Sequence, residues 1–295
     1  MHIPDGFLSA PVWGTFDLMA IPAVSAIARR AQRGIQERDI PLLGVMGAFV
    51  FAAQMINFPV GPGTSGHLVG GALLAIALGP APAAIAMTAI LAIQALVFQD
   101  GGVLALGANV FNMAIVGVLA GYLPYRAWSG VSRSFAVFAA GLLSVLASGC
   151  LALAELLVSG VPMPRHVLFI SLGFFLMNAV IEGAITVAAI RAIERLNPRL
   201  LRSPQRSSSS LIAVMAVAAV VLAVAGILVA SANPDGIEQL ARAHAPAWLN
   251  SPLADYQVHG IESLWLRRAA AGVAGLVLIY GACVFTGKLI ARRSV

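Results

Sequence analysis

The sequence contains repeated apolar runs of about 20 residues, and these limit the available folds more than any other feature. A helix rises 1.5 Å per residue, so about 20 apolar residues cross the ~30 Å hydrocarbon core of a bilayer. Of the 295 residues, 60% are hydrophobic and 10% are charged, whereas soluble domains have about 25% charged residues. The excess of apolar residues must face lipid. The sequence therefore predicts an all-α, polytopic helical bundle in a membrane.

About nine spans are predicted, seven followed by two. The third span is short, and the break at Gly79-Pro80-Ala81-Pro82 also allows it to be half of a bent or re-entrant pair, a backbone tolerated only where protein or a cavity covers it. We count it as crossing because the charge asymmetry is otherwise lost. The predicted spans are 8–28, 41–58, 67–79, 81–99, 103–122, 134–158, 167–190, 211–231 and 269–290.

Basic residues between the spans predict the orientation. Of the 18 Lys and Arg residues, 14 fall in the connections on one side and 4 in those on the other, which accounts for all of them (14 + 4 = 18). Basic residues accumulate on the cytoplasmic side of membrane proteins. Met1 and His67 are therefore expected outside, and Val295 in the cytoplasm. The four basic residues expected outside are Arg165, Arg242, Arg267 and Arg268.

Composition also divides the chain. Residues 199–210 are basic and serine-rich, which is typical of a linker, here cytoplasmic. We predict a permease domain at 1–198 and an accessory domain of two spans at 211–295, with an external loop that contains Pro234-Asp235-Gly236. The first arginine is Arg29, so a basic signal-peptide start is not expected. No basic and aromatic interleaving of the kind that binds nucleic acid occurs.

Motifs of soluble catalysis are missing from the sequence. There is no GxxxxGK[ST] phosphate loop, no HExxH and no GxSxG. We therefore expect a protein that is not an enzyme, with no catalytic residues, no cofactor-binding residues and no bound cofactor. Any ATP that drives it must be hydrolysed by partner subunits.

The amino terminus has the chemistry of a chelate. Met1 supplies a free amine, and His2 supplies an amide nitrogen and an imidazole. One metal ion can bind all three in fused rings, and Ni(II) and Cu(II) favour planar nitrogen coordination, whereas Zn(II) prefers tetrahedral sites. His67, in the glycine-rich segment from Gly61, is expected on the same side and would fill the fourth corner. Taken singly, His2 also fits a disordered terminus, and His67 a helix-start histidine bonded to a carbonyl.

Other polar residues in the apolar runs have structural interpretations. Glu155 and Glu182 are costly in lipid and are expected to face a partner or a pathway, with pairing to Asn178 or to each other as the structural alternative. Three amides, Gln94, Asn109 and Asn112, predict hydrogen bonds between helices. Gly117 and Gly121 form GxxxG, which is typical of close helix packing. Weaker candidates are the remaining histidines, for which we expect interfacial or solvated positions: His166, His244 and His259.

Several segments resemble the substrate-binding permease of nickel and cobalt energy-coupling-factor transporters, the CbiM/NikM family. The resemblance covers roughly residues 1–195, and the opening MHIPDGFLS is highly specific. Residues 211–295 are similar to the small accessory subunit of the nickel-type systems, NikN, fused to the permease. The segments that carry the permease resemblance are MHIPDGFLS, GTSGHLVGG, QALVFQDGGVLALGANVFNM and NAVIEGAIT.

The resemblance implies a square-planar nitrogen site made by Met1, His2 and His67, with nickel(II) or cobalt(II) as the transported substrate. It also implies a transmembrane coupling protein (T component) and two cytoplasmic ATPases as partners, in the inner membrane of a prokaryote. Two other classes of function stay open. One is an independent secondary transporter, for which Glu155 and Glu182 would supply the coupling path. The other is an intramembrane metalloenzyme, which would need an open coordination position and a general base.

The charge asymmetry generates a testable topology. A cysteine introduced at Ser208 should react with a membrane-permeant label and be protected from an impermeant one added outside, because residues 199–210 are predicted in the cytoplasm. Accessibility labelling of intact cells measures this. Labelling of position 208 from the outside alone would reverse the orientation.

Overall fold

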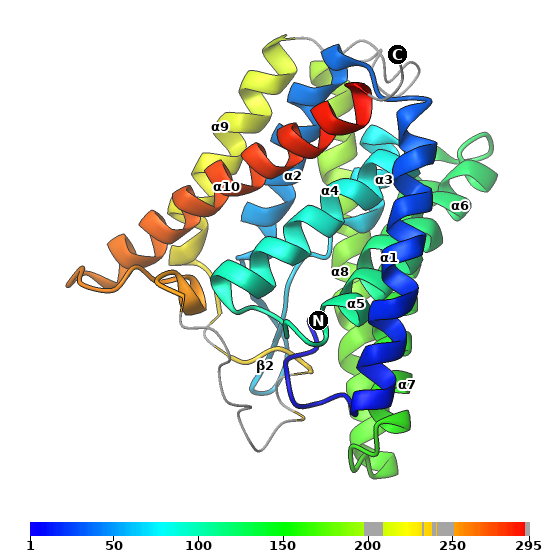
Figure 1. Ribbon diagram of the computed structural model, residues 1–295, viewed down its shortest axis with the longest axis vertical. Coiled ribbons are helices and arrows are strands. Elements are labelled where there is room, and N and C mark those ends of the chain that lie inside the picture. Colours follow the sequence, from blue (N-terminus) through cyan, green and yellow to red (C-terminus); the bar gives the residue numbers. More distant parts are fainter. Residues whose placement is uncertain (198–208, 232, 238–239, 241–250, 293–295) are drawn as a thin grey trace.

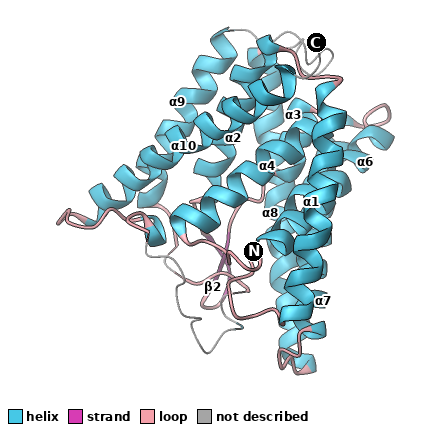
Figure 2. Cartoon of the chain, viewed as in Figure 1, coloured by secondary structure: helices cyan, strands magenta, loops and turns pink. Residues whose placement is uncertain are grey.

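The computed structural model describes residues 1–197, 209–231, 233–237, 240 and 251–292. Within these residues the protein is a bundle of helices with one small hairpin near the amino terminus (Figures 1 and 2). The predicted all-α membrane fold is confirmed: seven helices are long and apolar enough to cross a bilayer. Residues 199–208 of the predicted linker at 199–210, and His244, lie outside the described residues. The last two residues of that linker, Ser209 and Ser210, begin the helix Ser209–Ala225.

The amino-terminal half contains both short and long helices. A 3-10 turn at Glu37–Asp39 precedes α2, and a π-helical turn at Gln94–Phe98 extends α4. The antiparallel strands β1 and β2 pair Phe58 with Gly66. The bounds are α1 Ala10–Gln32, α2 Ile40–Gln54, β1 Phe58–Gly61, β2 Thr64–Gly66, α3 Gly71–Leu78 and α4 Pro80–Ile93.

The rest of the chain is built mainly from long helices. α5 passes through a π-helical stretch at Val110–Gly117 into α6. Short 3-10 turns at Gly226–Leu228 and Ala254–Tyr256 follow α9 and precede α10. The bounds are α5 Leu106–Asn109, α6 Val118–Trp128, α7 Arg133–Val158, α8 Arg165–Leu196, α9 Ser209–Ala225 and α10 Leu264–Arg292.

The second and third predicted spans differ from the structure. The second, at 41–58, is helical only to Gln54, and the chain then enters the β-hairpin. The third, at 67–79, is helical only over the eight residues of α3, which reach about 12 Å at 1.5 Å per residue. The predicted break is confirmed, because Gly79 has a φ of 86° and Pro80 starts α4. Neither segment belongs to the seven long apolar helices, and the count of nine spans stays a prediction.

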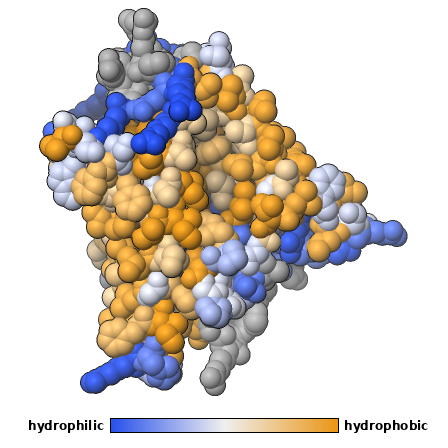
Figure 3. All heavy atoms as spheres, turned by 180° about the vertical axis from the view of Figure 1, so that it is seen from behind, coloured by the Kyte–Doolittle hydropathy of each residue, from blue (hydrophilic) through white to orange (hydrophobic). Residues whose placement is uncertain are grey.

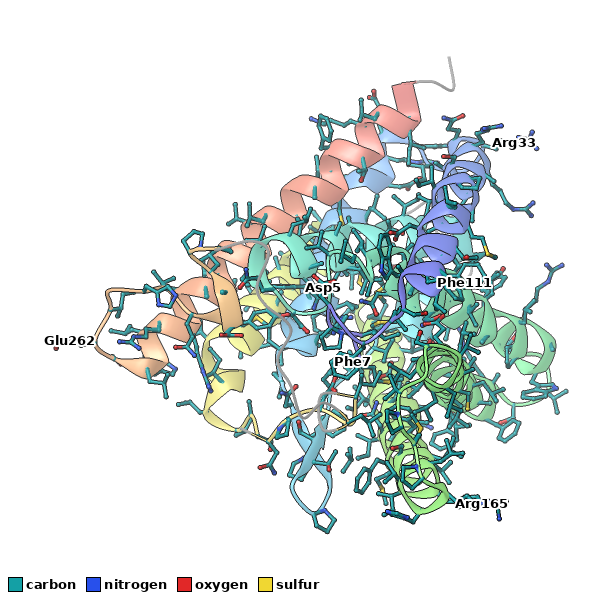
Figure 4. All side chains as sticks on the ribbon, turned by 60° about the horizontal axis from the view of Figure 1, so that its bottom comes forward. Asp5, Phe7, Arg33, Phe111, Arg165 and Glu262 are labelled. Carbon is teal, nitrogen blue, oxygen red and sulfur yellow. The ribbon has the colours of Figure 1, made fainter. Side chains whose placement is uncertain are left out.

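On the face shown in Figure 3, a broad apolar area covers the middle of the molecule, and hydrophilic residues gather toward its ends. Exposed leucine, isoleucine and valine side chains are frequent on α1, α8, α9 and α10, as expected for surfaces in contact with lipid. Arg33 and Arg165, which the charge count places on opposite sides of the membrane, lie at opposite ends of the bundle (Figure 4). Which of these ends faces the cytoplasm stays a prediction.

Small residues allow close packing where the sequence predicts it. A Cβ on Gly121 would lie 2.8 Å from the Cβ of Ala72 on α3, and one on Gly117 would lie 2.5 Å from Ser148 Oγ on α7. The Gly117–Gly121 pair therefore joins the π-helical stretch and α6 to two neighbouring helices. Close helix packing at this GxxxG is confirmed.

The two carboxy-terminal helices pack against the rest of the bundle (Figure 1). A Cβ on Gly47 of α2 would lie 2.8 Å from Cys283 Sγ on α10, and one on Gly275 of α10 would lie 2.3 Å from the Phe51 ring of α2. Such short separations require glycine on both helices. As a result α10 is held directly beside α2. In the connection from α9 to α10, Asp235 lies beside Ser65 of the hairpin.

Candidate metal centre

The first three residues enter the bundle. Met1 and His2 are 5% and 3% exposed, and Ile3 is fully buried. Two hydrogen bonds pair the Ile3 backbone with the Asn109 amide, at 2.8 Å to Oδ1 and 3.0 Å from Nδ2. The Gly102 N–H donates to the Ile3 carbonyl at 2.8 Å. The amino terminus is thus fixed in the protein interior. Asn109 was predicted to bond another helix, but it binds the amino-terminal segment instead.

Asp5 anchors the terminal segment from its other end. Its carboxylate accepts hydrogen bonds from the backbone N–H groups of Val103 at 3.0 Å and Leu104 at 2.8 Å. A Cβ on Gly102 would lie 2.2 Å from Asp5 Oδ1, so glycine is required for this approach. Gly6 follows with a φ of 87° and turns the chain toward α1 (Figure 4). Asp5 and Gly6 therefore form a turn.

Glu182 of α8 holds the segment that carries His67. Its two carboxylate oxygens accept from the backbone N–H groups of Val69 at 2.7 Å and Gly70 at 2.8 Å. These two N–H groups precede α3 and have no carbonyl acceptor within a helix, so the Glu182 carboxylate serves as their acceptor. Asn178 of α8 donates to the His67 carbonyl at 3.3 Å. The third predicted span becomes helical late because side chains of α8 bind its first backbone groups.

The predicted ligands lie together. The Met1 amine is 2.7 Å from His67 Nε2, and the rings of His2 and His67 are nearly parallel, with centroids 5.3 Å apart and an angle of 7°. Nitrogen ligands bind a divalent transition metal at about 2.0 Å, so neighbouring corners of a square are about 2.8 Å apart. The spacing between the Met1 amine and His67 Nε2 therefore fits one edge of a planar nitrogen site.

Two carboxylates that sequence reasoning missed complete the surroundings of these nitrogens. Asp235 Oδ2 makes an ion pair with the Met1 ammonium and lies 3.9 Å from His67 Nε2. Asp100 Oδ1 lies 3.1 Å from His2 Nδ1. Burial alone would raise the pKa of Asp100. The charge and the hydrogen bond of His2, the charge of His67 and the hydrogen bond from Tyr256 together lower this pKa below its ordinary value. Asp100 is therefore an ionised acceptor.

His2 is held in an orientation that metal binding must change. Its Nδ1 faces Asp100, while its buried Nε2 has no hydrogen-bond partner among the described residues. Only Nδ1 can close a small chelate ring with the amide of the same residue. The contact between His2 and Asp100 must therefore open before the imidazole joins the amine and amide on one ion.

A polar chamber adjoins the site. Its volume is about 410 Å³, and it lies between the amino-terminal bundle and the connection from α9 to α10. Asp100, Asp235 and Asp255 line it, together with His67 and one arginine, Arg268. A hydrated dication with six waters at ~30 Å³ each occupies roughly 180 Å³. The chamber has the size and the acidic character to admit such an ion to His67.

The buried carboxylates have other partners than predicted. Glu155 pairs with Asn112, whose Nδ2 donates to Oε2 at 2.9 Å, and Glu182 binds backbone. Neither pairs with Asn178 or with the other glutamate. Gln94 Nε2 donates to Gln54 Oε1 at 2.9 Å, an interhelical bond as predicted.

The glycines before His67 shape the hairpin and its packing. Gly61 belongs to β1, and Gly63, with a φ of 68°, turns the hairpin. A Cβ on Gly66 would lie 2.3 Å from Asn178 Oδ1, so this glycine allows α8 to pack against the hairpin. His166 and His259 are exposed. The glycines serve the hairpin and its packing.

The fold defines a multi-pass membrane protein, and an amine beside two imidazoles in its interior is typical of a transition-metal site. The family described as "Cobalt uptake substrate-specific transmembrane region", CbiM, matches residues 2–200. The chain belongs to this family.

Individual relatives extend the match to the carboxy terminus. The chain is 35% identical to the putative fused nickel transport protein NikMN of Archaeoglobus fulgidus, over 95% of both chains. It is 41% identical to a putative metal transport protein of Haloquadratum walsbyi, over 68% of this chain and 93% of that one. A crystal structure of a transition metal transporter superimposes with a TM-score of 0.60 at 31% identity, over 67% of this chain and 94% of the other. These matches support a permease of the CbiM/NikM type fused to a NikN-like segment.

The hydrogen bonds by which Glu182 holds the His67 segment can be tested by substitution. Glu182→Ala should lower the unfolding temperature and weaken nickel binding, because two buried N–H groups lose their acceptor at about 1–3 kcal/mol each. Glu155→Gln is the matched control: it changes the other buried carboxylate, which contacts Asn112 instead, and should leave nickel affinity unchanged. Equal losses of nickel affinity in both variants would contradict the assignment.

Proposed function

We propose that the chain is the substrate-binding membrane component of an ATP-driven, energy-coupling-factor importer of nickel(II). The Met1 amine, the His2 amide and imidazole, and the His67 imidazole would hold one ion in a plane. The observation that carries this proposal is the 2.7 Å separation of the Met1 amine from His67 Nε2 in a buried site. Relatives named as nickel and metal transport proteins support it.

Nickel is favoured over cobalt by the ligand set. Displacing an amide proton and taking four nitrogens in a plane suits Ni(II), which favours tetragonal and planar nitrogen coordination. The similarity to a fused nickel protein over 95% of the chain points the same way. Cobalt(II) import by the same mechanism is the alternative, since the family description refers to cobalt uptake.

Each residue has a defined task in capture. The acidic chamber concentrates the cation from outside, and the amine and the two imidazoles replace its water ligands. Asn109 and Asp5 fix the terminal segment so that its nitrogens stay within reach of His67. Burial of Met1, His2 and His67 excludes water once the ion is bound.

Energy for transport is proposed to come from partners. The sequence has no phosphate-binding loop, so a T component and two cytoplasmic ATPases would supply ATP hydrolysis and the conformational change. An independent secondary transporter is less well supported, because Glu155 and Glu182 hold Asn112 and the start of α3. A metalloenzyme is less well supported, because all four positions in the plane would be filled by the chain's own nitrogens and planar Ni(II) binds axial ligands weakly.

The terminal chelate predicts an unusual response to insertion. One alanine inserted between Met1 and His2 keeps every side chain but enlarges the fused rings, so it should abolish nickel binding as completely as His67→Ala. Isothermal titration of the purified, detergent-solubilised variants measures this. Thermal unfolding of each metal-free variant controls for folding. Wild-type affinity in the insertion variant would refute the terminal chelate even if His67 proved essential.

Dependence on partners is tested by reconstitution. The purified chain alone in liposomes should bind nickel but should neither hydrolyse ATP nor accumulate nickel against a gradient. Vesicles that contain the chain together with its coupling protein and ATPases should accumulate nickel when ATP is supplied. Concentrative uptake by the chain alone would exclude the importer mechanism proposed here.

A further inference from the structure

The connection from α9 to α10 reaches the candidate metal centre along a defined path. Ser231 N–H donates to the Asn57 carbonyl at 2.8 Å, and Ser65 N–H of β2 donates to the Pro234 carbonyl at 2.9 Å. Ser65 Oγ donates to the Asn233 carbonyl at 2.6 Å. Residues 233–235 therefore run beside β2 and contact Ser65, which lies two residues before His67 in the sequence. This pairing fixes the position of Asp235.

The two oxygens of the Asp235 carboxylate have different partners. Oδ1 accepts from the Ile237 N–H at 2.7 Å, which orients the side chain. Oδ2 makes the ion pair with the Met1 ammonium. A free chain end loses conformational freedom when it is fixed, and Asp235 helps to hold the amine 2.7 Å from His67 Nε2 before any metal arrives.

Tyr256 makes a second connection from the same part of the chain. Its hydroxyl donates to Asp100 Oδ2 at 2.5 Å, and Asp100 Oδ1 contacts His2 Nδ1. The Tyr256 ring stacks on Phe98 with centroids 4.7 Å apart at an angle of 15°. Through Asp100, Tyr256 therefore acts on the second predicted ligand residue, as Asp235 acts on the first.

The charge beside Asp235 indicates that it supports the metal and does not compete with it. Without metal, the carboxylate faces an ammonium of charge +1. With nickel bound, the ammonium and the His2 amide have each released one proton to solvent, and the dication with the amide anion again has charge +1. The coordinated amine keeps two N–H groups that can donate to Oδ2. The contact is therefore compatible with both states, as expected of a residue that orients a metal ligand.

We propose that the carboxy-terminal segment controls the metal site, with Asp235 positioning the Met1 amine and Tyr256 holding the Asp100 carboxylate against His2 until that contact opens for the metal. This inference rests on the proposed terminal chelate and assigns it two further positioning residues. The segment acts from the external end of the site. A permease without it would contain the nitrogen ligands but would hold the amine and His2 less firmly.

Two isosteric substitutions test this in the full-length chain. Asp235→Asn keeps the Oδ1 acceptor for Ile237 but removes the charge on Met1, and Tyr256→Phe keeps the stacking on Phe98 but removes the hydroxyl. Loss of a residue that orients a metal ligand costs about 10–100-fold in metal affinity. Nickel affinity, measured by titration, should fall by about that factor in Asp235→Asn. It should rise by about 2–10-fold in Tyr256→Phe, because the contact between Asp100 and His2 then opens more easily. Slower association, measured by stopped flow, should account for most of the loss in Asp235→Asn.

Glu262→Gln is the matched control. It removes a carboxylate of the same connection, on an exposed residue that does not line the chamber. This variant should change nickel affinity less than twofold. The visible absorption spectrum of saturated Asp235→Asn should match that of the wild type, because the four nitrogens are unchanged. A merely structural defect would alter the spectrum or lower the unfolding temperature of the metal-free chain.

Each other outcome overturns the inference. An equal effect of Glu262→Gln would mean that only the total charge of the connection matters, and a changed nickel spectrum would make Asp235 a direct ligand. Tighter binding by Asp235→Asn would make Asp235 a competitor of the metal. If Asp235→Asn does not fold, Tyr256→Phe decides, and wild-type or weaker nickel affinity there refutes the proposal. Failure of the terminal chelate itself is recognised separately, by wild-type affinity in the alanine-insertion variant.

Discussion

Burial of the amino terminus is the constraint on which the rest of the site depends. A chain end carries a charged amine and an unpaired backbone, and both are costly to remove from water without partners. The structure supplies them: Asn109 and Gly102 bind Ile3, and the Met1 ammonium meets Asp235 and His67. Once these bonds hold the end of the chain inside the bundle, the first two residues become available as metal ligands at a fixed place.

Residues far apart in sequence share this one site. The amine comes from position 1, the two imidazoles from positions 2 and 67, and the carboxylates from positions 100 and 235. The polar groups of α8 fix the His67 segment in an irregular conformation, which is tolerated at membrane depth because protein covers it. Fusion of the carboxy-terminal segment to the permease therefore has a direct structural consequence, since Asp235 and Tyr256 reach the site from the connection between α9 and α10.

The sequence was sufficient to predict the class of fold and the pairing of Met1 with His2, because span length and chelate chemistry are local properties. His67 was added from its expected side of the membrane and from the family resemblance. The sequence was insufficient for contacts that depend on three-dimensional packing. Glu182 was expected to face a pathway or to pair with a side chain, yet it binds the backbone of Val69 and Gly70 and shortens the third predicted span. The residues around Asp235 in the sequence do not indicate its contact with Met1. That contact follows only from the pairing of residues 233–235 with β2. Its place in a short Pro-Asp-Gly motif was the only signal available.

X-ray absorption at the nickel edge of the loaded, full-length chain tests the central claim most directly. The account predicts four nitrogen neighbours in a square plane at about 2.0 Å, with the strong pre-edge feature of planar nickel. It also predicts loss of that feature when one alanine separates Met1 from His2. An octahedral spectrum with mixed oxygen and nitrogen neighbours, unchanged by the insertion, would contradict the account.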